Sequence, residues 1–245
     1  MVPDGVLTLI PFSTLYDGEQ FLVEKFAIAT TPALRLTSPQ RLKREELQAL
    51  IVGLSDAVQG YSALPNVAKE LKTIQGIVGG DVFQNTAYTQ GRLNKQLSSR
   101  PYRIMHMATH GEFDSKPEKT YVLTYNKKLT INKLEDLIKL SQFRDEPVEL
   151  LTLSACRTAV GDDKAALGLA GIAIKSGARS AIATLWFVDD EATMLTITEF
   201  YRQFQANPEL SKAQALRNAQ MKLIEQDRYW HPAYWAPFLI VGNWL

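Results

Sequence analysis

Short runs of apolar, often β-branched residues alternate with amphipathic segments along most of this chain of 245 residues. This alternation is typical of an α/β protein, in which helices connect the parallel strands of one sheet. The clearest strand-like runs are residues 47–54, 103–109, 149–155 and 180–186. The sequence therefore predicts an α/β fold with a mostly parallel central sheet and helices on its faces.

Helix signals occupy the segments between these runs. Residues 65–78 repeat apolar positions at helical spacing and stop at Gly79. Side chains that commonly cap helix N-termini precede three further helical patterns, namely Thr89, Asp189 or Asp190, and Ser211. We also expect helices after Thr130 and over the small residues 165–176.

The two ends of the chain contain further strand-like runs. Residues 6–12 and 21–28 flank Asp17-Gly18, a strong turn signal, and predict a pair of strands. Residues 234–242 predict a last strand. No Pro-, Gly- or Ser-rich linker divides residues 1–245, so we expect one domain. The turn at residues 3–5 has no strand before it, which suggests an N-terminally truncated fragment, although Met1 equally suits a native start.

Charge and hydropathy argue against two classes of partner. The 27 Lys and Arg residues nearly balance 26 Asp and Glu residues, and no basic run or RNA-binding aromatic motif occurs. No stretch of 18 uncharged apolar residues occurs either. We therefore expect neither nucleic acid nor a membrane as a direct partner.

Cys156 is the single cysteine of the chain. It cannot form an internal disulfide or a cysteine-based metal site, and this usage indicates a reducing compartment. The N-terminus lacks the basic and then apolar layout of a signal peptide, so we expect a cytoplasmic protein. Since a lone cysteine is also often a small buried apolar residue, its neighbours have to decide its role.

His110 and Cys156 each follow a strand-like run. In a parallel sheet both would lie at the carboxyl edge, where open α/β sheets bind ligands. A thiolate is a nucleophile, and a nearby imidazole can activate it or protonate a leaving amine. The backbone N–H groups of Gly111 and Cys156 would suit an oxyanion. By spacing alone, a loop histidine and a core cysteine fit equally.

Several blocks of the sequence resemble the CHAT family, the caspase-like domains associated with tetratricopeptide repeats (TPR). They are residues 106–111 (HMATHG), 153–159 (LSACRTA), 177–180 (GARS) and 185–193 (LWFVDDEAT), with matching ends at residues 3–12 and 235–242. The blocks occur in the family's order and cover nearly the whole chain, while residues 38–101 match only loosely.

The resemblance implies a caspase-like α/β/α sandwich, because the family is grouped with caspases, separases and gingipains. The family histidine falls on His110 and its nucleophile on Cys156. This implies a cysteine endopeptidase that forms an acyl-enzyme on a protein or peptide substrate, without a cofactor. It also implies a regulatory role, common in bacteria, and a TPR-containing segment or partner. The family works with a dyad, and no third member is expected.

Asp189 and Asp190 fall in a block that, in the related separases, shapes the pocket for a basic residue before the cut. We therefore hypothesise that Asp190, together with Asp189, favours Arg or Lys by charge pairing. The alternative is helix capping, for which adjacent acids at a helix start are well suited.

The other histidines are interpreted as structural. Alternation places His106 on the strand face of His110 but deeper in apolar sequence, which favours a buried, hydrogen-bonded side chain. A metal site is not expected, because the glutamate of the zinc-protease motif is absent from this run. His231, between Trp230 and Pro232, is interpreted as loop packing.

Three other functions are considered. A catalytically silent caspase-like signalling module that needs a partner would keep the fold without turnover. A thiol hydrolase or acyltransferase for small molecules would use the same dyad. A nucleotide-binding protein would share the sheet class, but the phosphate-loop pattern GxxxxGK[ST] is absent.

Overall fold

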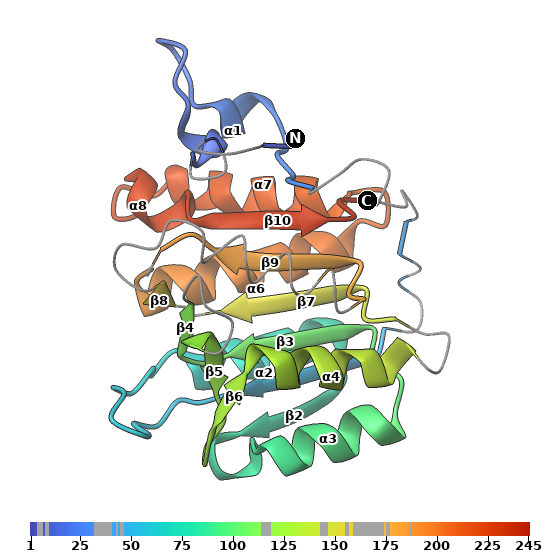
Figure 1. The fold of residues 1–245 in the computed structure, drawn as a ribbon. Coiled ribbons are helices and arrows are strands. Elements are labelled where there is room, and N and C mark those ends of the chain that lie inside the picture. Colours follow the sequence, from blue (N-terminus) through green and yellow to red (C-terminus); the bar gives the residue numbers. More distant parts are fainter. Residues whose placement is uncertain are drawn as a thin grey trace.

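The computed structural model describes most of the chain (Figure 1). The described residues are 1–3, 7, 10–31, 41–42, 44, 47–113, 119–142, 147–154, 157–158, 174, 177–186 and 188–245. Cys156 and the helix expected over residues 165–176 lie outside this set, apart from Ile174.

A six-stranded sheet forms the centre of the molecule, in the order β10-β9-β7-β3-β1-β2. In that order the strands are Phe238–Gly242, Ser180–Thr184, Leu150–Ser154, Ile104–Ala108, Ala49–Gly53 and Asp81–Gln84. Neighbouring strands are parallel except for β10, which is antiparallel to β9. The predicted α/β fold with a mostly parallel sheet is confirmed.

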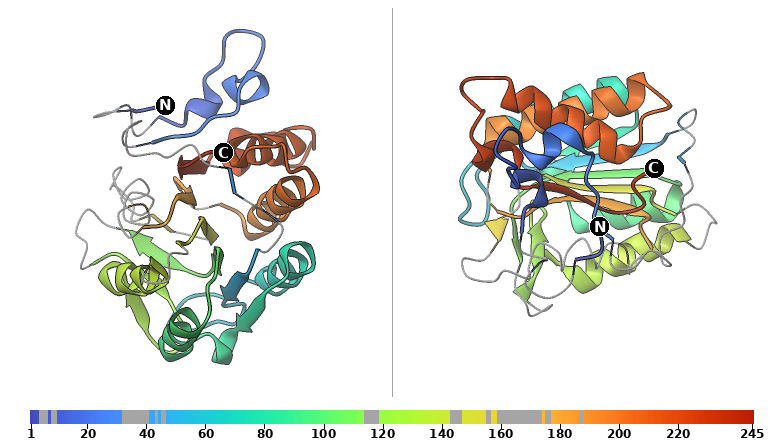
Figure 2. Two further views of the ribbon diagram at one scale, coloured as in Figure 1. Left: turned by 90° about the vertical axis from the view of Figure 1, so that its right-hand side faces the viewer. Right: turned by 90° about the horizontal axis from the view of Figure 1, so that it is seen from above.

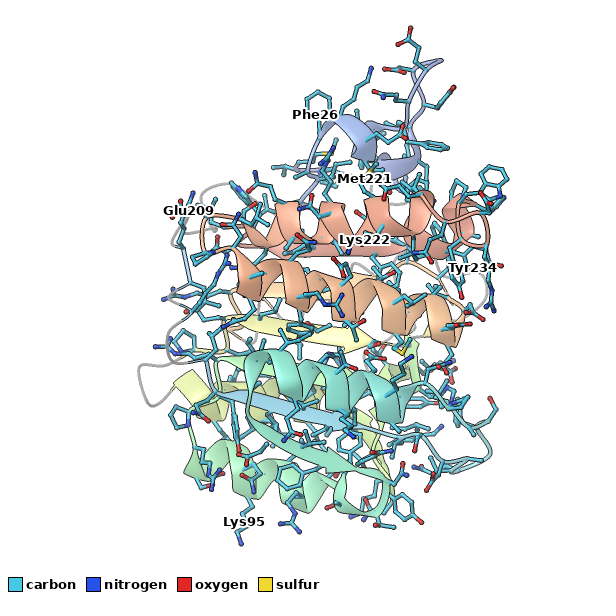
Figure 3. All side chains as sticks on the ribbon, turned by 180° about the vertical axis from the view of Figure 1, so that it is seen from behind. Phe26, Lys95, Glu209, Met221, Lys222 and Tyr234 are labelled. Carbon is cyan, nitrogen blue, oxygen red and sulfur yellow. The ribbon has the colours of Figure 1, made fainter. Side chains whose placement is uncertain are left out.

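Helices cover both faces of this sheet, and Figure 2 shows it between the two layers. One layer contains α2 (Val67–Val78), α6 (Asp190–Ala206) and α7 (Lys212–Ile224), and the other α3 (Gln90–Ser99) and α4 (Ile131–Gln142). Figure 3 views the first layer, with Met221 and Lys222 labelled on α7. None of the helices that the structure describes is long and apolar enough to span a membrane.

Alternate residues of the central strands enter two separate apolar cores. In β1, Ala49 and Ile51 contribute to the core under α2 and α6, while Leu50 and Val52 contribute to the core under α3 and α4. All four are completely buried. Because both faces of a parallel sheet are covered, most residues of its central strands are apolar, which is why these runs could be recognised in the sequence.

The capping predictions hold where the structure describes them. Thr89 Oγ1 accepts a hydrogen bond from the Arg92 N–H, and Ser211 forms a capping box with Gln214. The helix α2 ends at Gly79, whose φ of 70° favours glycine. These signals were readable because a cap depends on residues within one turn of the helix end.

A second, four-stranded sheet of short strands, in the order β6-β5-β4-β8, was not predicted. These strands are Lys128–Thr130, Tyr121–Leu123, Gly111–Phe113 and Arg157–Thr158. Of these four strands, only β5 lies in a clear strand-like run of the sequence, residues 121–125. Two or three residues are too few to show a period, and β4 begins directly after His110.

The predicted strand pair near the N-terminus is wrong in the part that the structure describes. Residues Phe12–Thr14 form the 3-10 turn η2, and Leu22–Lys25 form the single-turn helix α1. The Asp17-Gly18 turn itself is present, since Asp17 Oδ1 accepts the N–H groups of Glu19 and Gln20. The Phe21 N–H donates to the Glu24 carboxylate, a local bond that favours a helical turn over a strand.

The last predicted strand is shorter than expected, because residues Pro232–Trp235 form the short helix α8. His231 caps this helix and Pro232 is its first residue, a position that suits proline. A further 3-10 turn, η4, spans Asn85–Ala87.

The N-terminal segment covers the outer edge of β10. Thr30 pairs in parallel with Val241, and its N–H donates to the Ile240 carbonyl at 2.9 Å. The Gly242 N–H donates back to the Thr30 carbonyl at 2.9 Å. Arg217 on α7 holds the same segment by donating to the carbonyls of Val23 and Glu24.

Candidate active site

His110 lies two residues beyond the end of β3, at the carboxyl edge of the large sheet. The last residues of β3 and β7, Ala108 and Ser154, are partners in register, and the Thr109 N–H donates to the Ser154 carbonyl at 3.1 Å. His110 and Cys156 therefore each lie two residues beyond this pair in the sequence. Cys156 itself lies outside the described residues.

A backbone carbonyl orients the His110 imidazole. Nε2 lies 2.8 Å from the carbonyl oxygen of Ser62, in the loop that connects β1 to α2. A carbonyl oxygen can only accept, so Nε2 carries the proton, and Nδ1 is left as the nitrogen that can take up a proton. The side chain is only 8% exposed. This partner was missed because a backbone carbonyl has no signature in the sequence.

Gly111 begins β4 and pairs with Val122 of β5. The Leu123 N–H donates to the His110 carbonyl at 2.8 Å. The backbone at His110 is thus held by β7 through Thr109 on one side and by β5 on the other. The N–H groups of Gly111 and Cys156 are the expected oxyanion donors, and of the two only Gly111 is among the described residues.

Asp189 and Asp190 lie beyond β9, at the same edge of the sheet. Asp189 caps α6, and its Oδ1 accepts the N–H groups of Glu191 and Ala192 at 3.0 Å each. Asp190 is half-buried, and its Oδ2 accepts two hydrogen bonds from Asn66, from the backbone N–H and from the side-chain amide.

One loop therefore connects the predicted site residues. Ser62, which binds His110, and Asn66, which binds Asp190, are four residues apart. The structure thus binds His110 and Asp190 to nearby residues of this loop. Asp189 contacts only its own helix in the hydrogen bonds given above.

His106 is completely buried, as predicted, on the face of the sheet covered by α2 and α6. Its Nε2 lies 3.1 Å from Oε1 of Glu70, which is also buried. The contact does not meet the geometry of a hydrogen bond. The predicted burial is correct, and the predicted hydrogen bond is replaced by this contact with a carboxylate that the sequence did not reveal.

His231 accepts a hydrogen bond from the Ala233 N–H through Nδ1, as the cap of α8. This is a local packing role of the kind predicted. Within the part of the chain that the structure describes, no group of three His, Cys, Asp or Glu side chains is placed to hold a metal ion.

Comparisons with known proteins extend this description. The curated human protein Tetratricopeptide repeat protein 28 is 22% identical over an alignment 298 positions long, which covers 99% of this chain but 12% of that protein. The chain thus spans about an eighth of the length of this relative.

Two solved structures share the fold. The first is the complex of the pro- and mature domains of RgpB from Porphyromonas gingivalis, with a TM-score of 0.55 at 10% identity. The second is the Arg-specific cysteine proteinase gingipain R, with a TM-score of 0.53 at 11% identity. Each match covers 80% of this chain and slightly less than half of the solved chain, 47% and 46%. At these identities the likeness concerns the fold, which is that of the caspase-like gingipains.

The family model of the CHAT domain matches residues 1–243, nearly the complete sequence. This match agrees with the resemblance found in the sequence blocks, and the fold agrees with the caspase-like sandwich that the resemblance implied. The chain belongs to the CHAT domain family.

Proposed function

We propose that this chain is a cysteine endopeptidase with His110 and Cys156 as its catalytic pair. The observation that carries the proposal is the placement of His110. Its ring is held by the Ser62 carbonyl at the end of β3, next to the strand that leads to Cys156. The CHAT family and the gingipain-like fold support the same class of chemistry.

In the proposed reaction, Nδ1 of His110 takes the proton of the Cys156 thiol, and the resulting thiolate attacks the carbonyl carbon of the peptide bond. The backbone N–H groups of Gly111 and Cys156 bind the oxyanion that forms. His110 then gives the proton on Nδ1 to the departing amine, which leaves an acyl-enzyme. In the second half, Nδ1 takes a proton from water as the water attacks the thioester, and the acid product leaves with the thiol restored.

The proposed preference is for a basic residue before the cut. Asp190 is half-buried, and Asn66 occupies only one of its two oxygens in the bonds described above. The second oxygen can pair with Arg or Lys, and Asp189 adds negative charge at the same helix start. One solved structure of this fold is named as that of an Arg-specific cysteine proteinase, which is consistent with such a pocket.

A regulatory role beside tetratricopeptide repeats is part of the proposal. It rests on the family and on the name of the human relative, of which this chain covers 12%. The competing candidate is a catalytically silent module of the same fold that acts through a partner.

The test is cleavage of a peptide library with varied residues before the cut, for the wild type, Cys156→Ala and His110→Ala. His231→Ala, which alters a histidine remote from the pair in sequence, is the matched control. The proposal predicts turnover that is lost in the first two variants and retained in the control. Turnover that survives Cys156→Ala would reject it. If the wild type turns over no peptide and a thiol-reactive peptide does not label Cys156, the silent module is the correct candidate.

A further inference from the structure

Tyr61 lies against the His110 imidazole and immediately precedes Ser62 in the sequence. The centroids of the two rings are 5.0 Å apart, with an angle of 36° between their planes. Two consecutive residues of one loop therefore hold the imidazole, one through its ring and the next through its carbonyl oxygen. Neither Tyr61 nor Ser62 belongs to the proposed catalytic pair or to the proposed pocket for a basic side chain.

A chain of hydrogen bonds fixes Tyr61 in turn. The hydroxyl oxygens of Tyr61 and Tyr121 are 2.7 Å apart, and the Tyr121 hydroxyl donates to Glu112 Oε2 at 2.6 Å. Because the Tyr121 proton is used on the carboxylate, Tyr61 is the donor between the two hydroxyls. Glu112 lies in β4, two residues after His110, and Tyr121 lies opposite it in β5. These hydrogen bonds thus run from the loop back to β4, the strand that directly follows His110.

The environment keeps both hydroxyls protonated and able to donate. Burial, followed by the hydrogen bond to Tyr121, raises the pKa of Tyr61 to about 12. Burial and the hydrogen bond to Glu112 raise the pKa of Tyr121 as well. Among the described residues, the charged groups next to these hydroxyls are Glu112 and Lys128 of β6. The Lys128 Nζ lies 4.0 Å from the centroid of the Tyr121 ring.

We propose that Tyr61, held by Tyr121 and Glu112, is a positioning residue that keeps the His110 imidazole in one orientation, with Nε2 protonated toward Ser62 and Nδ1 free for proton transfer. The catalytic consequence rests on the proposed function. The orientation of the ring does not, because it follows from contacts between described residues.

The variants Tyr61→Phe and Tyr121→Phe remove one hydroxyl each and keep the rings. The matched control is Tyr102→Phe, because the Tyr102 hydroxyl also donates to a carboxylate, Asp81 Oδ2, at 2.6 Å but lies away from His110. If one hydrogen bond restrains the loop, kcat should fall roughly tenfold in the first two variants, with KM little changed and the control close to wild type. The kcat of Tyr61→Ala should fall further, because this variant also removes the contact between the two rings.

A second readout does not depend on peptidase activity. The chain has three histidines, so the ring nitrogens of His110 can be assigned by NMR from their loss in His110→Gln. The proposal predicts nitrogen shifts of a single tautomer, protonated at Nε2, in the wild type and in Tyr102→Phe. In Tyr61→Phe and Tyr121→Phe, the shifts should move toward the average of two tautomers.

The outcomes separate the two proposals. Shifts that change only in the Tyr61 and Tyr121 variants support the positioning role even if the wild type cleaves no peptide, in which case the proposed function alone fails. Shifts that match those of Tyr102→Phe would overturn the positioning role. A kcat that rises in Tyr61→Ala would also overturn it, because Tyr61 would then be a cover over His110.

Discussion

One oxygen of the Asp190 carboxylate accepts both the backbone N–H and the side-chain amide of Asn66, each at 2.9 Å. This pair joins the start of α6 to the start of α2. A role of Asp190 in substrate recognition can therefore be separated from its role in the fold by comparing a variant of Asp190 with a variant of Asn66.

Asp190→Asn should abolish the preference for Arg or Lys over neutral residues before the cut, because it removes the charge that pairs with them. Asn66→Ala should keep that preference and lower the free energy of unfolding by about 1–2 kcal/mol, because it removes the amide donor to a charged group. Peptide selectivity and urea denaturation of both variants measure the two effects. Equal selectivity in Asp190→Asn and the wild type would leave Asp190 a purely structural residue.

At Asp189, the effect of helix capping can be measured separately from the effect of the negative charge. Asp189→Ala removes the side chain that binds the Glu191 and Ala192 N–H groups and should cost about 1 kcal/mol of stability. Asp189→Asn keeps a good cap without the charge, so its stability should match the wild type. Selectivity assays should show a smaller loss of basic preference in Asp189→Asn than in Asp190→Asn. The reverse order would exchange the two proposed roles.

The buried contact between Glu70 and His106 predicts a large effect on stability. Glu70→Ala leaves the His106 ring buried without its carboxylate partner and should lower the free energy of unfolding by about 3 kcal/mol. The double variant Glu70→Leu with His106→Leu should recover most of this loss, because apolar groups replace both partners. Chemical denaturation of the three proteins measures the difference. A double variant no more stable than Glu70→Ala would show that the Glu70–His106 pair stabilises the fold more than two apolar side chains do.

The burial of Lys212 predicts how the free energy of unfolding changes with pH in the alkaline range. Its side chain is completely buried at the start of α7, and Nζ donates to the Leu245 carbonyl, among the charges of Glu149, Arg44 and Arg179. Burial lowers the pKa of Lys212 from its ordinary 10.5 to about 8.

The free energy of unfolding changes with pH in the direction set by which state of the chain binds more protons. Between pH 8 and pH 10.5 the unfolded chain binds the Lys212 proton and the folded chain releases it, so this residue makes the free energy of unfolding rise with pH, by up to about 3 kcal/mol. Below pH 8 both states are protonated and the residue adds no slope. Denaturation of the wild type and Lys212→Met at several pH values should show this rise only in the wild type. Identical slopes would mean that Lys212 titrates normally in the folded chain.

The parts of the fold that could be predicted are those specified by nearby residues. The strands that hold Ala108 and Ser154 are mostly apolar because both sheet faces are covered. The caps at Thr89, Asp189 and Ser211 act within one helical turn. His110 could be placed at a strand end for the same reason.

The parts that could not be predicted depend on the approach of distant segments. The Ser62 carbonyl and the Tyr61 ring reach His110 from a loop nearly fifty residues earlier, and no local pattern marks that meeting. Glu70 lies in an amphipathic helix, where a charged residue would normally face water. It is buried because His106 of the central strand lies beneath it.

The bonds between Thr30 and β10 have a consequence for the behaviour of the chain in solution. A strand with a free row of N–H and C=O groups is a template on which another chain can add its own strand. Thr30 occupies part of that row on β10, so the N-terminal segment limits sheet-to-sheet association between molecules. Variants that lack the first thirty residues would expose this edge and become prone to aggregate, even with every residue around His110 unchanged.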